Sequence, residues 1–298
     1  MSAGHAYFKV ASSDFRLFHF IIDSVLEGDW VSYVADQALG GKEEYKDLDP
    51  AKLATANPGS RTRFLRNQRQ ILLEMFVSRL VDNFQSYLVD LIRLVLRSRP
   101  TMLSTSQQSL TLEELLKYGS IEELVHDVIE RKVNSLSYEG FTELHAWCAD
   151  RGIPLQVSGQ SRIAVIELIA TRNVIAHNRG IVDERYVRIV GSPRFALGAH
   201  RALEVDDLFD ALGILHRVVF ETDEAAIQTF GLSSTTMVEE KRGHEPEASD
   251  EARPSKPAAP LGRRTRRTTR CRGRAVDGAP LNAGVRLQSW ASFDEGSS

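Results

Sequence analysis

Apolar side chains recur every three or four residues through most of the first 230 positions of the chain. This is the period of a helix that buries one face, so the pattern predicts a protein built of helices. The longest run, Arg63 to Arg97, contains no glycine or proline, and Arg99-Pro100 ends it because a residue before proline disfavours helical backbone. Further helices are predicted over residues 14–39, 138–150, 161–178 and 204–230.

Short polar signals mark helix starts and turns. Thr111-Leu-Glu-Glu114 and Ser120-Ile-Glu-Glu123 fit the capping box, in which a hydroxyl and a carboxylate satisfy free backbone N–H groups, and they predict two short helices. Asn57-Pro58-Gly59 predicts a turn. For residues 181–190 we expect extended backbone that can add a small hairpin. The remainder indicates an all-α fold class.

The composition changes beyond residue 231. Residues 239–251 are acidic and polar, and residues 263–274 hold seven arginines and no acidic residue. Such segments bury too little apolar surface to offset chain entropy. We therefore predict one all-α domain over residues 1–231 and a disordered, arginine-rich tail over 232–298. The tail arginines can contact RNA phosphates, bind an acidic partner or stay solvated, and Trp290 can be a docking residue.

Charge and cysteine content exclude several functional classes. The net formal charge of −3 is close to neutral and predicts no general attraction to nucleic acid. Cys148 and Cys271 are too few and too far apart for a disulfide framework or a zinc cluster, and we expect Cys148 to be a core thiol. No carboxylate cluster or Cys/His spacing indicates a metal, so no metal or other cofactor is predicted.

The apolar segments do not indicate a membrane protein. The first residues lack the basic and then apolar run of a signal peptide. A membrane span needs about 20 mostly apolar residues. The densest apolar region, residues 71–96, is interrupted by Glu74, Arg79, Asp82, Asp90 and Arg93. We expect no membrane partner and a reducing, cytoplasmic location.

The most specific chemical signal is Thr171-Arg-Asn-Val-Ile-Ala-His177-Asn-Arg-Gly180, at the end of the predicted helix 161–178. A permanently charged arginine beside a histidine that titrates near neutral pH suits phosphate chemistry. At about 100° per residue, Asn173 and His177 share a helix face, whereas Arg172 and His177 lie about 140° apart. An antiparallel second copy would bring Arg172 of one subunit near His177 of the other, which favours a composite site in a homodimer.

The order Arg172-Asn173-x-x-x-His177 resembles the R-x4-6-H motif of the HEPN superfamily, small all-α proteins that include many metal-independent ribonucleases. That motif often has a polar residue directly after the arginine, where this chain has Asn173. The continuation His177-Asn178-x-Gly180-Ile-Val-Asp183 is similar to the helix exit of prokaryotic members, and the domain looks like the RiboL-PSP-HEPN and MAE types. The resemblance covers about residues 60–230 and implies a HEPN-like helical bundle.

The resemblance also implies an activity, the cleavage of RNA by internal transesterification. The RNA 2′-OH would attack the adjacent phosphorus and leave a 2′,3′-cyclic phosphate. His177 would take the 2′-OH proton or protonate the leaving 5′-oxygen, Arg172 would stabilise the phosphate charge, and Asn173 would orient the phosphate or His177. Prokaryotic members often act in antiphage defence or toxin–antitoxin systems, which suggests a neutralising partner protein.

Other interpretations of the same residues stay open. Cations are favoured near a helix C-terminus, so Arg172 and His177 also have a structural interpretation. Some HEPN domains bind a nucleotide or a protein partner without cleaving. Glu74 and Glu167 can face the cleft and hold Arg172 or His177, or they can be solvated or ion-paired elsewhere.

Overall fold

The structure, a computed structural model, describes residues 2–40, 49–103, 111–191 and 194–232. The all-α prediction is confirmed, since these residues form helices and their extended backbone makes one isolated bridge, between Ile181 and His200. The predicted disordered tail, from residue 233 onward, lies outside the described residues. The helices are α1 (Ala3–Leu39), α2 (Pro50–Ala56), α3 (Ser60–Asn67), α4 (Arg69–Ser98), η1 (Pro100–Leu103), α5 (Leu112–Leu115), α6 (Ile121–Glu139), α7 (Phe141–Asp150), α8 (Gly159–Asn178), α9 (Glu184–Val190) and α10 (Val205–Phe230).

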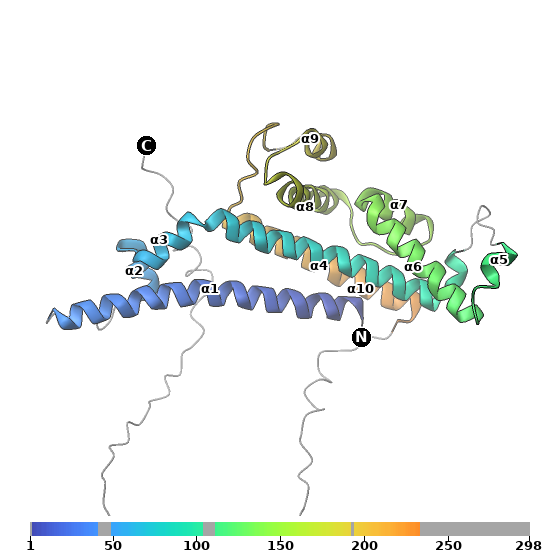
Figure 1. Ribbon diagram of the computed structural model, residues 1–298, viewed down its shortest axis with the longest axis horizontal. Helices are drawn as coiled ribbons and strands as arrows, with labels where there is room; N and C mark the ends of the chain where they lie inside the picture. The colour runs from blue at the N-terminus through green and yellow to red at the C-terminus, as the bar shows by residue number, and fades with distance from the viewer. Residues whose placement is uncertain (1, 41–48, 104–110, 192–193, 233–298) are drawn as a thin grey trace, which may run out of the picture.

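Helix α4 is the centre of this arrangement. Helices α1 and α10 lie alongside it for most of its length, and α6 and α8 also contact it (Figure 1). The buried side chains of α4 therefore pack against several helices. They include Leu73, Val77, Val81, Phe84, Leu91 and Val95. Within the described residues, none of the helices combines the length and the apolar character that crossing a bilayer requires.

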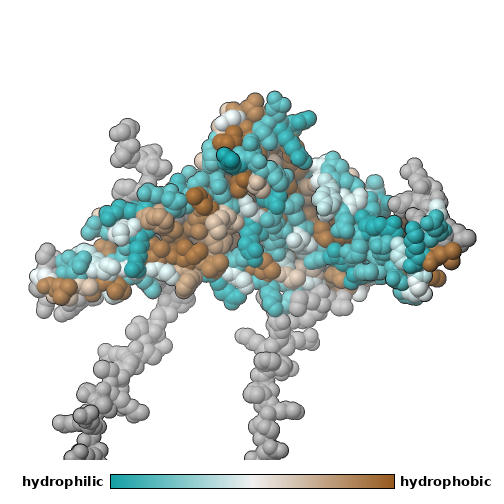
Figure 2. All heavy atoms as spheres, viewed as in Figure 1, coloured by the Kyte–Doolittle hydropathy of each residue, from teal (hydrophilic) through white to brown (hydrophobic). Residues whose placement is uncertain are grey.

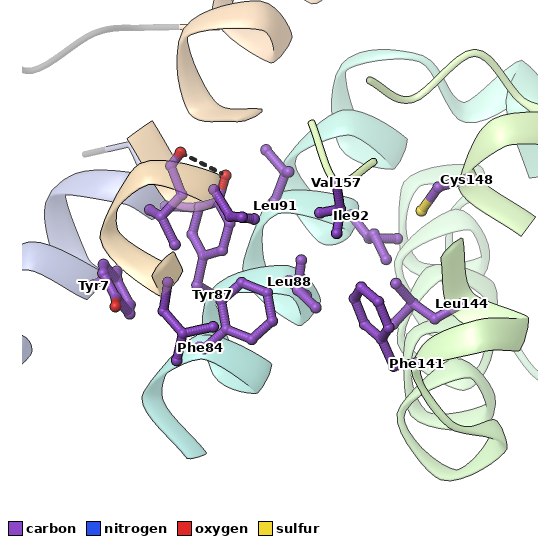
Figure 3. Packing of buried hydrophobic residues seen from close by; sticks show 14 of the residues in the cluster. Tyr7, Phe84, Tyr87, Leu88, Leu91, Ile92, Phe141, Leu144, Cys148 and Val157 are labelled. Atoms are coloured by element: carbon purple, nitrogen blue, oxygen red, sulfur yellow. Dashed lines mark hydrogen bonds between the residues drawn. The ribbon is translucent and has the colours of Figure 1, made fainter. Parts of the chain in front are cut away.

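Figure 3 shows the core around the second half of α4. Tyr87 donates a hydrogen bond of 3.3 Å to the backbone carbonyl of Val219 on α10. Phe141 and Leu144 of α7 are buried in the same cluster. Cys148 is also buried there, and burial raises the pKa of its thiol to about 12, which keeps the thiol protonated and poorly nucleophilic. The expectation of a core thiol is confirmed.

The predicted single helix over residues 63–97 is wrong, because the chain breaks it at Gln68. Gln68 has φ −101° and ψ 9°, and it separates α3 from α4. The break lets α3 lie against α1 with Thr62 and Leu65 buried. No glycine or proline marks this turn, so the apolar periodicity of the sequence does not reveal that the helix is interrupted there.

The two capping boxes predicted at Thr111 and Ser120 precede helices of very different length. Ser120 accepts a hydrogen bond of 3.1 Å from the N–H of Glu123, as the capping box predicts. Glu123 in return accepts from the N–H of Gly119 rather than from that of Ser120. The helix that follows, α6, has 19 residues instead of being short, whereas α5 has only 4.

Residues 181–190 were expected to be extended, and that prediction is wrong for most of the segment. Asp183 accepts a hydrogen bond of 2.7 Å from the N–H of Tyr186 and begins α9. Only Ile181 pairs as extended backbone, in the bridge to His200. The β-branched side chains that favour a strand are outweighed by the aspartate cap and by the burial of Tyr186 against α8.

The first testable prediction concerns the anchor of α3 on α1. The buried carboxylate of Asp29 accepts hydrogen bonds from the N–H groups of Arg61 at 3.2 Å and Thr62 at 2.8 Å. Asp29→Ala would leave these donors without a partner, and we expect it to lower the free energy of unfolding by about 1–2 kcal/mol. Urea unfolding measures the change. Asp36→Ala, at an exposed position of α1, is the control, and equal losses in both variants would contradict the anchor.

Candidate functional site

Helix α8 carries the three predicted catalytic residues. Val165 and Ile169 belong to the main core cluster around α4, and Val174 packs in a smaller cluster with residues of α9. Burial on these two sides fixes the rotation of α8 about its own axis. The remaining side of the helix, with the three predicted residues, stays open to solvent to different degrees.

Helix α8 ends at Asn178, and the C-cap residue is Arg179. Asn178 Nδ2 donates a hydrogen bond of 2.6 Å to the carbonyl of Ile181. Arg179 takes the left-handed conformation, with φ 53°, and Gly180 follows with φ 77°. The positive φ of Gly180 favours glycine at this position, and its missing side chain leaves room for His200, whose Nε2 would lie 2.8 Å from a Cβ atom there.

A groove of about 960 Å³ runs between α4, α6, α7 and α8. Arg172, Asn173 and His177 all line it, so the structure brings the three predicted residues to one groove of a single chain. Leu88, Leu136 and Leu144 contribute apolar surface along its wall. The other charged and aromatic side chains along the groove are Asp82, Asp90, Arg93, Tyr138, Phe141 and Arg185.

Arg172 is held by a carboxylate of the neighbouring helix. Its Nε lies 2.6 Å from Oδ1 of Asp82 on α4, an ion pair whose alignment falls outside hydrogen-bond geometry. Its Nη1 donates a hydrogen bond of 3.2 Å to Oδ1 of Asn173. The Asp82 side chain is 49% exposed, so water screens the pair, and pairs of this kind contribute about 0.2–1 kcal/mol. A phosphate can therefore compete with Asp82 for the guanidinium.

His177 differs from Arg172 in being exposed. Among the described residues, its ring makes no hydrogen bond or ion pair. No hydrogen bond or ion pair joins Arg172 to His177, in agreement with their predicted angular separation, yet both border the groove. The imidazole is free to exchange a proton with a molecule bound there.

Neither glutamate proposed as a support for the motif has that role. Glu74 accepts a hydrogen bond of 2.8 Å from Gln70 and lies 3.5 Å from Nε2 of His200. Glu167 accepts from the hydroxyl of Tyr186 at 3.3 Å. Both side chains face the segment after α8 rather than Arg172 or His177, because the rotation of α8 turns Glu167 toward α9. They support the exit of the helix.

Two residues of the groove were missed by the sequence argument. Asp82 was noted only as a charge within an apolar run, although a carboxylate on a core helix is a natural partner for an arginine on a neighbouring helix. Arg185 was missed because residues 181–190 were expected to be extended. In α9 it is exposed and lines the groove, and among the described residues it has no ion pair.

The described ranges were also searched for metal ligands, and they hold no group of three His, Cys, Asp or Glu side chains placed to share an ion.

Comparisons with known proteins return no relative of this chain. No family model matches it, and neither a curated protein nor a solved structure does so. The motif and the groove are therefore the features of this chain that bear on its function.

The second prediction concerns Asp82. Asp82→Asn removes the carboxylate charge that holds Arg172 but keeps a side chain of similar size. In chains that also carry His177→Ala, we expect Asp82→Asn to tighten the binding of single-stranded RNA about twofold to fivefold, because a phosphate no longer competes with a carboxylate. Fluorescence anisotropy at fixed ionic strength measures the affinity.

Asp36→Asn is the matched control for this measurement, since it makes the same charge change on an exposed part of α1 far along the sequence from the groove residues. If the two substitutions change affinity equally, or if Asp82→Asn weakens binding, Asp82 does not compete with a phosphate for Arg172.

Proposed function

We propose that the chain is a HEPN-type endoribonuclease that cleaves RNA by transesterification without a metal. The observation that supports this best is the placement of Arg172, Asn173 and His177 on one groove, with the imidazole exposed and unpaired among the described residues. The resemblance of these residues to the R-x4-6-H motif supplies the reaction class. The groove supplies room for a nucleotide, since ligand sites typically enclose about 300–1,000 Å³.

The proposed reaction uses the 2′-OH of RNA as its nucleophile. The 2′-oxygen forms a bond to the adjacent phosphorus while the bond from phosphorus to the 5′-oxygen breaks. The products are a 2′,3′-cyclic phosphate and a free 5′-hydroxyl. His177 either takes the 2′-OH proton while water protonates the leaving 5′-oxygen, or protonates the 5′-oxygen while water takes the 2′-OH proton.

In this proposal, Arg172, Arg185 and the amide of Asn173 stabilise the negative charge of the phosphates. Arg172 exchanges Asp82 for a phosphate oxygen and stabilises the extra negative charge of the transition state. Asn173, which already accepts a hydrogen bond from Arg172, keeps that guanidinium on the groove side of α8. Arg185 provides a second positive charge for a flanking phosphate.

The proposal includes a homodimer in which two α8 helices pack antiparallel and the sites are completed across the interface. Its support is the angular offset of Arg172 from His177 on α8, with no hydrogen bond or ion pair between them within one chain. A cellular role in antiphage defence or in a toxin–antitoxin pair, with a neutralising partner, follows from the family resemblance alone.

A second candidate function fits the same geometry. The ion pair between Arg172 and Asp82 keeps the arginine occupied when no ligand is bound. A HEPN domain that binds a nucleotide or a protein partner without cleaving RNA would show the same pair. The two candidates differ in turnover and not in binding.

The third prediction separates these candidates. Single-stranded RNA incubated with the chain in excess EDTA should be cleaved, and His177→Ala should reduce the rate at least about 100-fold, the usual contribution of a general acid or base. Denaturing gel electrophoresis measures the rate. His126→Ala, on the exposed side of α6, is the matched control and should keep full activity. Full cleavage by His177→Ala would contradict catalysis by His177. RNA binding without cleavage by the unsubstituted chain would favour the non-catalytic binding function.

The fourth prediction tests the composite site. Arg172→Ala and His177→Ala chains are inactive separately, but a mixed dimer contains one site with both residues intact if sites are shared. We expect the mixture to recover about a quarter of the wild-type rate, since half of the dimers are mixed and each has one of two sites. No recovery, with subunit exchange shown by differently tagged chains, would place the site within one chain.

A further inference from the structure

An apolar surface lies on the side of α4 that faces α1 and α3, apart from the groove. We call it the α1–α4 patch, and Figure 2 shows apolar side chains gathered over this part of the molecule. The exposed fractions of its side chains lie between 51% and 67%, large values for apolar residues. The patch comprises Leu17 and Phe20 of α1, Phe64 of α3, and Ile71 and Met75 of α4.

The register of α1 against α4 brings these residues together. Arg79 Nε lies 2.6 Å from Asp14 Oδ1, which pairs the two helices at that level. One turn further, the rings of Phe18 and Phe76 lie 5.0 Å apart in the core. Helices α1 and α4 run antiparallel (Figure 1), and Leu17 and Met75 directly precede Phe18 and Phe76 in the sequence, so both patch residues belong to this level of the helix pair.

The helices of the domain do not need these side chains for their own packing. Phe18, Ile22 and Leu72, which alternate with the patch residues along α1 and α4, already fill the core beneath. A contiguous group of large exposed apolar residues on a folded domain marks a surface that another segment covers.

The charge beside the patch limits what can cover it. Helix α3 carries Arg61, Arg63 and Arg66 and no acidic residue. Arg61 and Arg63 are exposed, and among the described residues Arg63 has no ion pair. A segment that combines large apolar side chains with negative charge would therefore complement both the patch and α3.

The chain itself contains such a segment. Beyond α10, the only aromatic residues of the sequence are Trp290 and Phe293. They stand with Val285 and Leu287 in nine residues, and Asp294-Glu295 follows directly. This order of apolar and then acidic side chains complements the patch and α3.

The connecting chain is long enough for this contact. Helix α10 ends beside the C-terminal end of α4, where Arg99 donates to the carbonyl of Thr229 at 3.4 Å. The patch lies near the start of α4, roughly 40 Å away at 1.5 Å per helical residue. Residues 233–284 could span about 170 Å at full extension, several times that distance.

We propose that residues 285–295 dock on the α1–α4 patch of their own chain, with Trp290 and Phe293 against the apolar side chains and Asp294-Glu295 against Arg61 and Arg63. Burial of two aromatic side chains supplies the driving force, and the acidic pair sets the direction of the segment. The proposal is independent of the ribonuclease assignment, because no residue of the groove takes part.

Disulfide trapping in the full-length chain tests this contact. Cys271→Ser removes the competing thiol, and Met75→Cys with Ser292→Cys places one thiol on the patch and one in the segment. We expect the intrachain disulfide to form at least about tenfold faster than in a matched chain with Phe220→Cys in place of Met75→Cys. Phe220 is a comparably exposed apolar residue, on α10. Mass spectrometry of the digested monomer measures both rates.

Two further variants make the result specific. Trp290→Ser with Phe293→Ser should reduce trapping at position 75 to the level of the position-220 control, with the circular dichroism spectrum unchanged. Arg63→Glu should slow trapping, and adding Asp294→Arg should restore it. Equal rates at positions 75 and 220, or disulfides formed only between chains at low protein concentration, would overturn the proposal.

Discussion

The packing of four helices onto α4 is the constraint on which the rest of the structure depends. Because α1, α6, α8 and α10 all contact it, α4 buries 12 of its 30 residues, and its charged side chains lie at the edges of these contacts. Asp82 emerges beside α8, where Arg172 meets it. The same helix that holds the core together therefore sets the electrostatics of the groove.

The helices were largely predictable from the sequence because apolar periodicity reports burial directly. The α8 motif, its exit at Asn178 and Gly180, and the left-handed end of α10 at Gly231 follow from local chemistry. The break at Gln68 and the helix α9 did not follow. At α9 the Asp183 cap and the burial of Tyr186 against α8 decide the backbone. At Gln68 the chain turns so that α3 packs on α1 with Thr62 and Leu65 buried, and residue spacing reveals neither contact.

The candidate site shows the same division. Residue types and helix angle predicted that Asn173 and His177 share a side, and both do line the groove. The angles between residues on α8 could not show that Arg172 also borders the groove. They also could not show that the carboxylate of Asp82 pairs with this arginine. From the sequence, Glu74 and Glu167 were also candidates to pair with Arg172. The rotation of α8 against α4 brings Arg172 to Asp82 instead.

We propose that RNA bound in this groove is cleaved by attack of the RNA's own 2′-hydroxyl. The most direct measurement is a mass spectrum of the products from a short RNA and from the same strand with a single 2′-deoxy substitution at the cleaved position. We predict a 2′,3′-cyclic phosphate and a 5′-hydroxyl from the RNA and no cut at the substituted position. Cleavage of the substituted strand at that position, or 5′-phosphate ends, would contradict the account.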